Sequence, residues 1–347
     1  MKIEIDAKEL KDKLTKVGYA INRRATLPIM SGVKIEAAPT GITFYATDLE
    51  KAVKIGVDGE VIAEGKAVVE HKMLKEAVKS LKDTVTIEAE ENKVTVNEAI
   101  TLPIMPIDEY PPEPTPENIL DDIMLSSTDV QRVIHAASED KARPILQGIY
   151  VGKKLIATDG YRLATTPISR PSQSNYIIPA TALQICLKIS KDDMTIQFTE
   201  KHAHILLPDA QIVTWLIEGN YPNTDMIING IEQAPHYIKL NRIEVIEAIK
   251  QVELPAKEGS GAIHVISNGD HNVRITSNNR DEMTAEVLVS ADIEGTPEEF
   301  GINYKFLLEC LNVLQEDIFT IQMNKPDTPI FIQEGAYTEV IMPLHLG

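Results

Sequence analysis

Two stretches of the chain are near copies of one another. Residues 27–33 read Leu27-Pro28-Ile29-Met30-Ser31-Gly32-Val33, and residues 143–149 read Arg143-Pro144-Ile145-Leu146-Gln147-Gly148-Ile149. A second pair lies further on, because residues 46–48 and 157–159 both read Ala-Thr-Asp, and residues 276–278 form a looser third copy, Thr-Ser-Asn. Such internal similarity indicates that one supersecondary unit is repeated along the chain.

Helix starts repeat together with these strands. Asp6, Ser126 and Asn241 can each cap a helix, and an acidic residue follows three positions later in every case. A capping side chain accepts hydrogen bonds from the unpaired backbone N–H groups of the first turn. Apolar residues then recur at i, i+4 and i+7, the spacing of one helix face. These residues are Leu10, Leu14 and Val17; Val130, Ile134 and Ala137; and Val245, Ile249 and Val252.

A second helix is expected in each repeat, directly after a short apolar strand. These helices are predicted over residues 74–81, 183–187 and 307–314. Alternating apolar and polar residues, as in 84–88 and 319–323, predict further strands between the helices. Each repeat is therefore predicted to be α+β, with two helices packed on an antiparallel sheet.

Two segments are typical of linkers between the repeats. Residues 111–116 are rich in proline, and residues 229–235 are polar and contain glycine and proline. We predict three domains on this basis, at residues 1–118, 119–235 and 236–347.

The composition is that of a globular protein. The 347 residues are 43% apolar and 25% charged. The two cysteines, Cys186 and Cys310, fall within apolar helical patterns, so we expect them in the core and expect no disulfide framework or cysteine-rich metal site. Neither a signal peptide nor a membrane span is expected, which favours a cytoplasmic location.

The sequence predicts no catalytic centre, no metal and no cofactor. It lacks a phosphate-binding loop, a His-Glu-x-x-His motif and a Gly-x-Ser-x-Gly motif. His202 and His204 alternate on a predicted strand with no acidic or cysteine cluster nearby. Asp48 and Asp159 occupy equivalent turns of separate repeats, so we interpret them as turn residues. Two alternatives stay open: a monomeric peptide-binding scaffold, and a hydrolase without a recognisable motif.

Several motifs together resemble the bacterial β sliding clamp family, the processivity subunit of the replicative DNA polymerase. The resemblance covers essentially the whole chain. The motifs are Thr26-Leu27-Pro28-Ile29, Glu109-Tyr110-Pro111, Arg143-Pro144-Ile145-Leu146-Gln147-Gly148, Ala157-Thr158-Asp159-Gly160-Tyr161-Arg162-Leu163-Ala164, Gly219-Asn220-Tyr221-Pro222 and Val340-Ile341-Met342-Pro343-Leu344.

The resemblance implies an assembly and a set of partners. Two copies would form a closed ring as a head-to-tail homodimer of repeated clamp domains, with duplex DNA encircled without regard to its sequence. An ATP-dependent clamp loader would open the ring. The replicative polymerase, repair polymerases, and ligase or mismatch-repair factors would bind through short clamp-binding peptides. The clamp itself would be a non-catalytic processivity factor.

The net charge of −18, taken alone, argues against DNA binding, because phosphate binding normally uses a basic surface. A ring retains DNA by topology, however, and needs little affinity. A negative outer wall would keep DNA off the outside, while basic groups on the inner helices would tolerate the duplex. The resemblance places the following residues toward DNA: Arg24, Arg23, Lys8, Lys11, Lys16, Lys72, Lys79, Arg132 and Arg242.

The resemblance also implies a peptide-binding cleft and a dimer interface. The cleft residues are Leu146, Thr158, Gly160, Tyr161, Arg162, Leu163, Pro222, Ile227, Val340, Met342, Pro343 and Leu344. The interface residues are Met73, Ala77, Ile100 and Leu102 from the first domain and Leu254 from the third. Three residues depart from the family pattern, because His345 replaces a usual arginine and the rim positions Tyr161 and Met226 are often more polar or basic. We therefore expect a more apolar rim.

Overall fold

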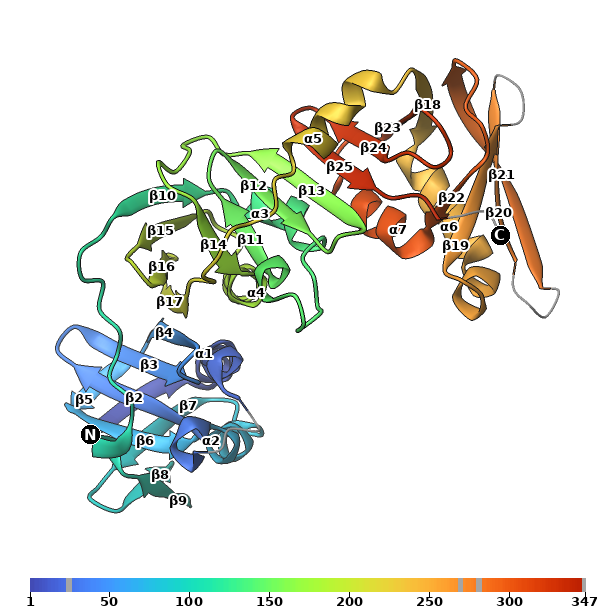
Figure 1. Ribbon diagram of the computed structural model, residues 1–347. Helices are drawn as coiled ribbons and strands as arrows, with labels where there is room; N and C mark the ends of the chain where they lie inside the picture. The colour runs from blue at the N-terminus through green and yellow to red at the C-terminus, as the bar shows by residue number, and fades with distance from the viewer. Residues whose placement is uncertain (23–26, 268–270, 279–282, 345–347) are drawn as a thin grey trace. The chain divides into compact units, whose positions relative to one another are not determined.

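The computed structural model describes residues 1–22, 27–267, 271–278 and 283–344. It divides into two compact units. The first unit is Met1–Ser127 with Thr181–Leu216, and the second is Thr128–Ala180 with Ile217–Gly347. Each unit contains one whole repeat and about half of the middle repeat (Figure 1).

The first unit is built on a sheet of 13 antiparallel strands. The alternation of buried and exposed residues along these strands, as in β1, matches the pattern read from the sequence. In sheet order the strands are β10 (Asp121–Leu125), β15 (Met194–Phe198), β16 (His202–Leu206), β17 (Ala210–Trp215), β4 (Lys51–Val57), β3 (Gly41–Thr47), β2 (Gly32–Ala38), β6 (Gly65–Glu70), β9 (Ile100–Met105), β8 (Lys93–Val96), β7 (Thr84–Ala89), β1 (Lys2–Asp6) and β5 (Glu60–Ala63).

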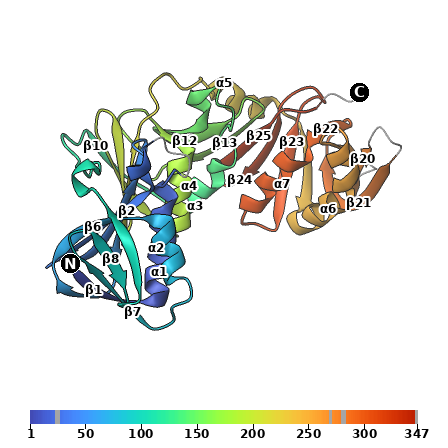
Figure 2. The ribbon, with the colours of Figure 1, turned by 90° about the horizontal axis from the view of Figure 1, so that it is seen from below.

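The helices of the first unit are α1 (Ala7–Val17), α2 (His71–Val78) and α4 (Ala180–Ile189). The predicted cap of α1 is confirmed, because Asp6 Oδ1 accepts from Lys8 N at 2.8 Å and from Glu9 N at 3.2 Å. Its predicted apolar stripe is fully buried, and α1 packs beside α2 (Figure 2). The capped, amphipathic pattern therefore forms the expected helix layer.

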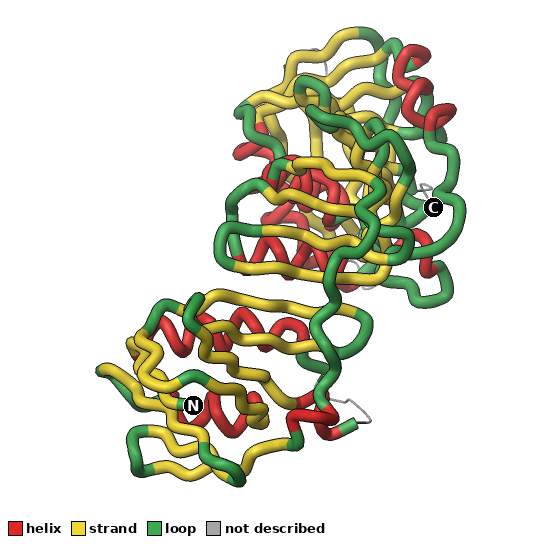
Figure 3. The backbone as a smooth tube through the Cα atoms, turned by 90° about the vertical axis from the view of Figure 1, so that its left-hand side faces the viewer, coloured by secondary structure: helices red, strands yellow, loops and turns green. Residues whose placement is uncertain are grey.

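The second unit is built on a sheet of 12 antiparallel strands. Figure 3 colours all strands of the chain yellow and the helices red. In sheet order the strands of this unit are β14 (Tyr176–Pro179), β11 (Gly148–Val151), β12 (Lys154–Thr158), β13 (Arg162–Pro167), β25 (Tyr337–Ile341), β24 (Ile330–Glu334), β23 (Ile318–Met323), β18 (His236–Asn241), β21 (Thr284–Glu294), β20 (Asn272–Asn278), β19 (Ala262–Ser267) and β22 (Phe300–Asn303).

The helices of the second unit are α3 (Ser127–Ile134), α5 (Asp225–Ile228), α6 (Arg242–Glu258) and α7 (Tyr304–Val313). The predicted cap Asn241 accepts from Ile243 N and Glu244 N, at 3.0 and 3.1 Å. The stripe predicted for α3 is only partly right. Val130 is buried, but Val133 and Ala136 are buried in place of Ile134 and Ala137. An eight-residue helix ends before i+7, so sequence spacing alone could not choose between the i+3 and i+4 neighbours.

Neighbouring repeats share their sheets at two equivalent junctions. In the first unit β17 pairs with β4, and in the second unit β25 pairs with β13. The register is the same in both, because Thr214 lies opposite Lys51 and Ile341 lies opposite Arg162. The strand of one repeat therefore continues the sheet of the next.

The cysteines lie in the core as predicted. Cys186 and Cys310 both have no exposed surface. Burial raises the pKa of the Cys186 thiol to about 12 and raises that of Cys310 well above its usual range. Both side chains therefore act as small apolar groups. No helix in the described ranges is long and apolar enough to cross a membrane.

Candidate functional site

A tight turn between β12 and β13 forms one wall of the candidate site. The Thr158 hydroxyl donates to Arg162 O at 2.6 Å and accepts from Gly160 N at 3.1 Å. Asp159 Oδ1 accepts from the backbone N–H groups of Tyr161 and Arg162, at 2.8 and 3.0 Å. Gly160 has a φ of +94°, a conformation that favours glycine. The Ala-Thr-Asp-Gly motif is therefore a self-bonded turn with a fixed shape.

Arg162 is held from several sides at the start of β13. Its Nε lies 3.1 Å from Asp159 Oδ2, Nη1 pairs with Glu309, and Nη2 donates to His135 O at 2.6 Å. The guanidinium also lies over the Phe306 ring, 4.3 Å from its centroid. Because its donors bind groups within the protein, Arg162 shapes the site and offers little free charge to a ligand.

The sheet junction supplies the apolar floor of the site. Leu163 pairs with Val340, and Met342 N donates to Tyr161 O at 2.8 Å, which holds the end of β25 against the turn. Leu163 and Val340 belong to a buried cluster that also includes Phe331. They are only 4% and 2% exposed, so they serve the core as well as the cavity.

The segment at the end of the middle repeat forms the opposite wall. Asn223 Oδ1 accepts from Asp225 N at 3.0 Å, and Thr224 O accepts from Ile227 N at 3.1 Å and Ile228 N at 3.0 Å. These bonds start the short helix α5, which presents Ile227, 43% exposed, to the site. The neighbouring Met226 is 87% exposed. This wall is therefore apolar where it meets solvent.

These walls enclose a cavity of about 160 Å³. Ten of the twelve cleft residues named from the sequence line it: Leu146, Thr158, Gly160, Tyr161, Arg162, Leu163, Pro222, Ile227, Val340 and Met342. Asn223 and Thr224 also line it and were missed, although they directly follow the Tyr221-Pro222 motif that had been identified. Their position directly after that motif was the signal that could have found them.

Pro343 and Leu344 are not part of the lining. Leu344 N donates to Gly301 O at 2.8 Å, so the chain end turns toward β22 after Met342. A residue whose backbone is held by such a bridge continues the sheet, which is the physical reason that Leu344 lies outside the lining. His345, noted as a departure from the family pattern, lies outside the described residues.

The first unit contains a twin of this turn. The Thr47 hydroxyl donates to Lys51 O at 2.9 Å and accepts from Leu49 N at 3.0 Å, as Thr158 does in the second unit. Trp215 occupies the position of Met342, and its Nε1 donates to Leu49 O at 2.9 Å. The two junctions share a framework but differ in the side chains that cover it. Glycine and methionine in the second junction correspond to leucine and tryptophan in the first.

The basic residues named from the sequence differ in how free their charges are. Lys8 and Lys72 are exposed on α1 and α2. Lys11 donates to Leu81 O, Lys16 lies 2.8 Å from Asp12, and Lys79 lies 3.3 Å from Glu76. Exposed pairs of this kind are weak and leave the lysines able to exchange partners.

Two of the arginines are tied into the second unit. Arg132 pairs with Glu334 and lies over the Tyr337 ring, and only 15% of its side chain is exposed. Arg242 donates from Nε to Glu316 O at 3.1 Å and from Nη1 to Leu311 O at 3.3 Å. Both therefore support the fold at their positions. Arg23 and Arg24 lie outside the described residues.

The five residues named for a dimer interface come from both units, and they differ in how exposed they are. Met73 and Leu254 are 45% and 58% exposed, whereas Ile100 and Ala77 are half-buried and Leu102 is 8% exposed. Among the described residues, 100–103 of β9 pair only with β8 on one side, and 284–290 of β21 pair only with β20. The end strands of each sheet also have an open edge, but β9 and β21 lie inside their sheets and each leaves a stretch of edge unpaired, of the kind that proteins normally cover.

No group suited to catalysis or metal binding emerges among the residues that the structure describes. No three His, Cys, Asp or Glu side chains gather there as metal ligands would. The His202 ring packs on Trp215, with centroids 4.2 Å apart, and burial lowers the pKa of both His202 and His204. Asp48 and Asp159 each bind the backbone of their own turn. These features match turn and packing roles.

Comparisons with known proteins agree along the whole chain. Three family models match the chain. They are described as the N-terminal, central and C-terminal domains of the DNA polymerase III beta subunit, and they match residues 1–114, 123–223 and 232–345, respectively. The beta sliding clamps of Staphylococcus epidermidis and Bacillus subtilis are 27% and 26% identical, over 94% and 99% of both chains. The crystal structure of the Bacillus subtilis DNA polymerase sliding clamp covers all of both chains at 25% identity, with a TM-score of 0.88.

A further structure supports the fold. The DNA polymerase III beta subunit of Borrelia burgdorferi, solved in complex with a natural product, is 18% identical and has a TM-score of 0.91 over both full chains. The resemblance drawn from the sequence is therefore confirmed, and so is the fold of three clamp domains with helices on antiparallel sheets. The chain belongs to the DNA polymerase III beta subunit family, the non-catalytic sliding clamps of DNA replication.

Proposed function

We propose that two copies of this chain join head to tail into a closed ring around duplex DNA, and that the 160 Å³ cavity binds the docking peptides of replication and repair proteins. These partners would be the replicative polymerase, the ATP-dependent clamp loader, repair polymerases, and ligase or mismatch-repair factors. The domains would span residues 1–118, 119–235 and 236–347, and the ring would act in the cytoplasm.

The repeat itself supports the ring. The order of strands along the three repeats shows two sets of equivalent strands. One set is β4, β13 and β21, and the other is β9, β17 and β25. Two of the three possible junctions are made within the chain, as β17 with β4 and β25 with β13. The remaining partners are β9 and β21, each of which has an open stretch. A second copy would pair β9 of one chain with β21 of the other, and two such contacts close a ring.

Burial along the strands supports the same pairing. β4 and β13 are mostly buried, whereas only Val289 is buried in β21, and Leu288 is 57% exposed. Covering β21 as its two equivalents are covered would remove apolar surface from water, worth about 25 cal/mol per Å². This contrast between equivalent strands is the observation that carries the proposed ring.

The chemistry of the cavity supports peptide docking. Its walls are largely aliphatic, and three of its polar lining residues, Thr158, Arg162 and Asn223, already bind other parts of the protein. Met342 and Tyr161, 39% and 62% exposed, form an apolar rim. A small, apolar, preformed pocket with an adaptable rim suits a leucine or phenylalanine anchor of a short peptide.

Leu254→Asp tests the ring interface most cleanly. Leu254 is exposed in the single chain, so aspartate there should leave the fold intact, but in the interface it would bury an unpaired charge. Replacing Leu102 would be a poorer test, because its side chain is already in the core. Light scattering at micromolar concentration should give twice 38.4 kDa for the native protein and 38.4 kDa for the variant.

Ile243→Asp is the matched control. Ile243 is 45% exposed and lies three turns away on the same helix, α6. Its variant should remain a dimer with the native circular dichroism spectrum. If Leu254→Asp also remains a dimer, the proposed interface is wrong.

A further inference from the structure

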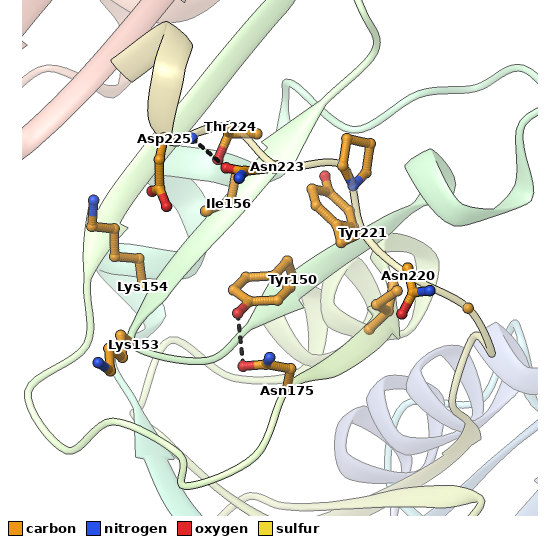
Figure 4. A pocket seen from close by; sticks show the side chains of 13 residues that line it. Tyr150, Lys153, Lys154, Ile156, Asn175, Asn220, Tyr221, Asn223, Thr224 and Asp225 are labelled. Carbon is orange, nitrogen blue, oxygen red and sulfur yellow. Dashed lines mark hydrogen bonds between the residues drawn. The ribbon is translucent and has the colours of Figure 1, made fainter. Parts of the chain in front are cut away.

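A second, larger cavity lies in the second unit beside the apolar pocket (Figure 4). Its volume is about 550 Å³, against about 160 Å³ for the pocket. Strands β11, β12 and β14 and the segment 219–225 surround it. The residues that matter for its chemistry are Tyr150, Lys153, Lys154, Asn175, Asn220 and Asp225.

The base of this cavity has a fixed geometry. The Tyr150 hydroxyl donates to Asn175 Oδ1 at 2.7 Å, and the rings of Tyr150 and Tyr221 pack with centroids 5.5 Å apart. Gly152 permits the first contact, because a Cβ there would lie 2.7 Å from the Tyr150 hydroxyl and 2.8 Å from Asn175 Oδ1. The backbone, the tyrosine and the asparagine therefore hold one another in place before any ligand binds.

The charge of the cavity is opposite to that of the protein. Lys153 and Lys154 line it, and within the described part of the chain no carboxylate lies within 4 Å of either ammonium group. In the first domain, by contrast, Lys34 and Lys54 share Glu113 as an ion-pair partner. Asp225 is the single carboxylate among the lining residues. A locally positive cavity on a chain of net charge −18 is suited to an acidic ligand.

The two cavities share part of their lining. Pro222, Asn223 and Thr224 line both of them, so a peptide anchored in the pocket has only this short segment to cross. An extended peptide also has backbone N–H groups that can donate to Asp225 and to the side-chain oxygens of Asn220 and Asn223. A polyphosphate chain has no such backbone donors. The lining therefore favours a peptide over a nucleic acid.

We propose that this cavity is a second subsite, which binds an acidic segment flanking the apolar anchor of docking peptides. The inference rests on the proposed peptide-binding function of the neighbouring pocket. In this arrangement the pocket supplies anchorage, and Lys153 and Lys154 select among partners by charge. Rim charges of this kind add specificity more than affinity.

Fluorescent peptides with one apolar core test the proposal. The core carries four glutamates or four glutamines, placed at either end, and is titrated against the dimer at low and high salt. At low salt the better-placed glutamate extension should bind about fivefold more tightly than its glutamine counterpart. The gain should shrink at high salt and disappear in the double variant Lys153→Ala with Lys154→Ala.

Two comparisons make the result decisive. The double variant Lys191→Ala with Lys201→Ala removes the same charge from exposed sites of the first unit, outside both cavities, and should keep the gain. If the glutamine peptide fails to bind the native protein, the proposed peptide-binding pocket is wrong. If it binds but glutamates add nothing, or the gain survives in the Lys153 and Lys154 variant, the second subsite is overturned. The subsite is also overturned if a thymidine oligonucleotide, and not the glutamate peptide, depends on these two lysines.

Discussion

Single residues at the turn between β12 and β13 decide whether the pocket exists. Gly160 adopts a φ that other residues avoid, and a Cβ added there would lie 2.8 Å from Arg143 Nη1. Arg143 in turn donates from Nη1 to Asp159 O at 2.8 Å. The sequence predicted Gly160 as a cleft residue, but the contact with Arg143 depends on packing that no motif records.

Gly160→Ala should weaken peptide binding more than it weakens the fold. The variant forces a strained φ, and we expect it to cost about 1 kcal/mol of stability and to shift the turn. Chemical denaturation and peptide titration measure the two effects. Gly56→Ala is the control, because a Cβ there meets only Asp209 O at an ordinary 3.7 Å. Normal peptide affinity in Gly160→Ala would show that the turn does not shape the pocket.

Ile227→Asp should remove the anchor site without harming the core. Ile227 lines the pocket yet is 43% exposed, unlike Leu163, whose replacement would also damage a buried cluster. A charge in place of an aliphatic wall should cost at least ~2 kcal/mol of binding free energy, roughly thirtyfold in affinity. Fluorescence anisotropy measures this loss. Ile318→Asp, at a site 53% exposed outside the lining, should bind peptide normally, and equal affinities in both variants would contradict the assignment.

At the scale of elements, local sequence signals predicted the helices well, whereas they did not predict which strand edges pair between repeats. The caps Asp6 and Asn241 and the stripes of α1 and α6 were predictable because helix periodicity and capping are local. The short helix α3 was too short to fix its own face. Which strands join at a junction depends on residues more than a hundred positions apart, as in β17 with β4, and no local pattern carries that information.

The chain end after β25 offers a test at this scale. β25 ends at Ile341, so deleting residues 342–347 should keep its strand pairing and the dimer intact, losing only the bridge from Leu344 to Gly301, while removing Met342 from the pocket. Circular dichroism and light scattering should be unchanged, and peptide affinity should fall at least tenfold. Deleting only residues 345–347 is the control and should bind peptide normally. Normal binding by the longer deletion would mean that Met342 contributes no wall.

At the scale of the whole molecule, the acidic charge is consistent with a ring that holds DNA by topology. Exposed Lys8 and Lys72 on the helices supply local positive charge, but the net charge of −18 makes tight binding to a phosphate backbone unfavourable. The family and the three-domain fold could be predicted from motif order along the chain. The open stretches of β9 and β21, which point to the second copy, became apparent only from the strand pairing.

Retention on circular DNA tests the central claim most directly. The protein is loaded by a clamp loader onto nicked circular DNA, separated from free protein by gel filtration, and the DNA is then cut once with a restriction enzyme. A ring that encircles DNA should remain on the circle and slide off the linear product. Leu254→Asp, unable to close the ring, should not be retained on either. Equal retention of the native protein on circular and linear DNA would contradict the account, because it would show binding by affinity and not by encirclement.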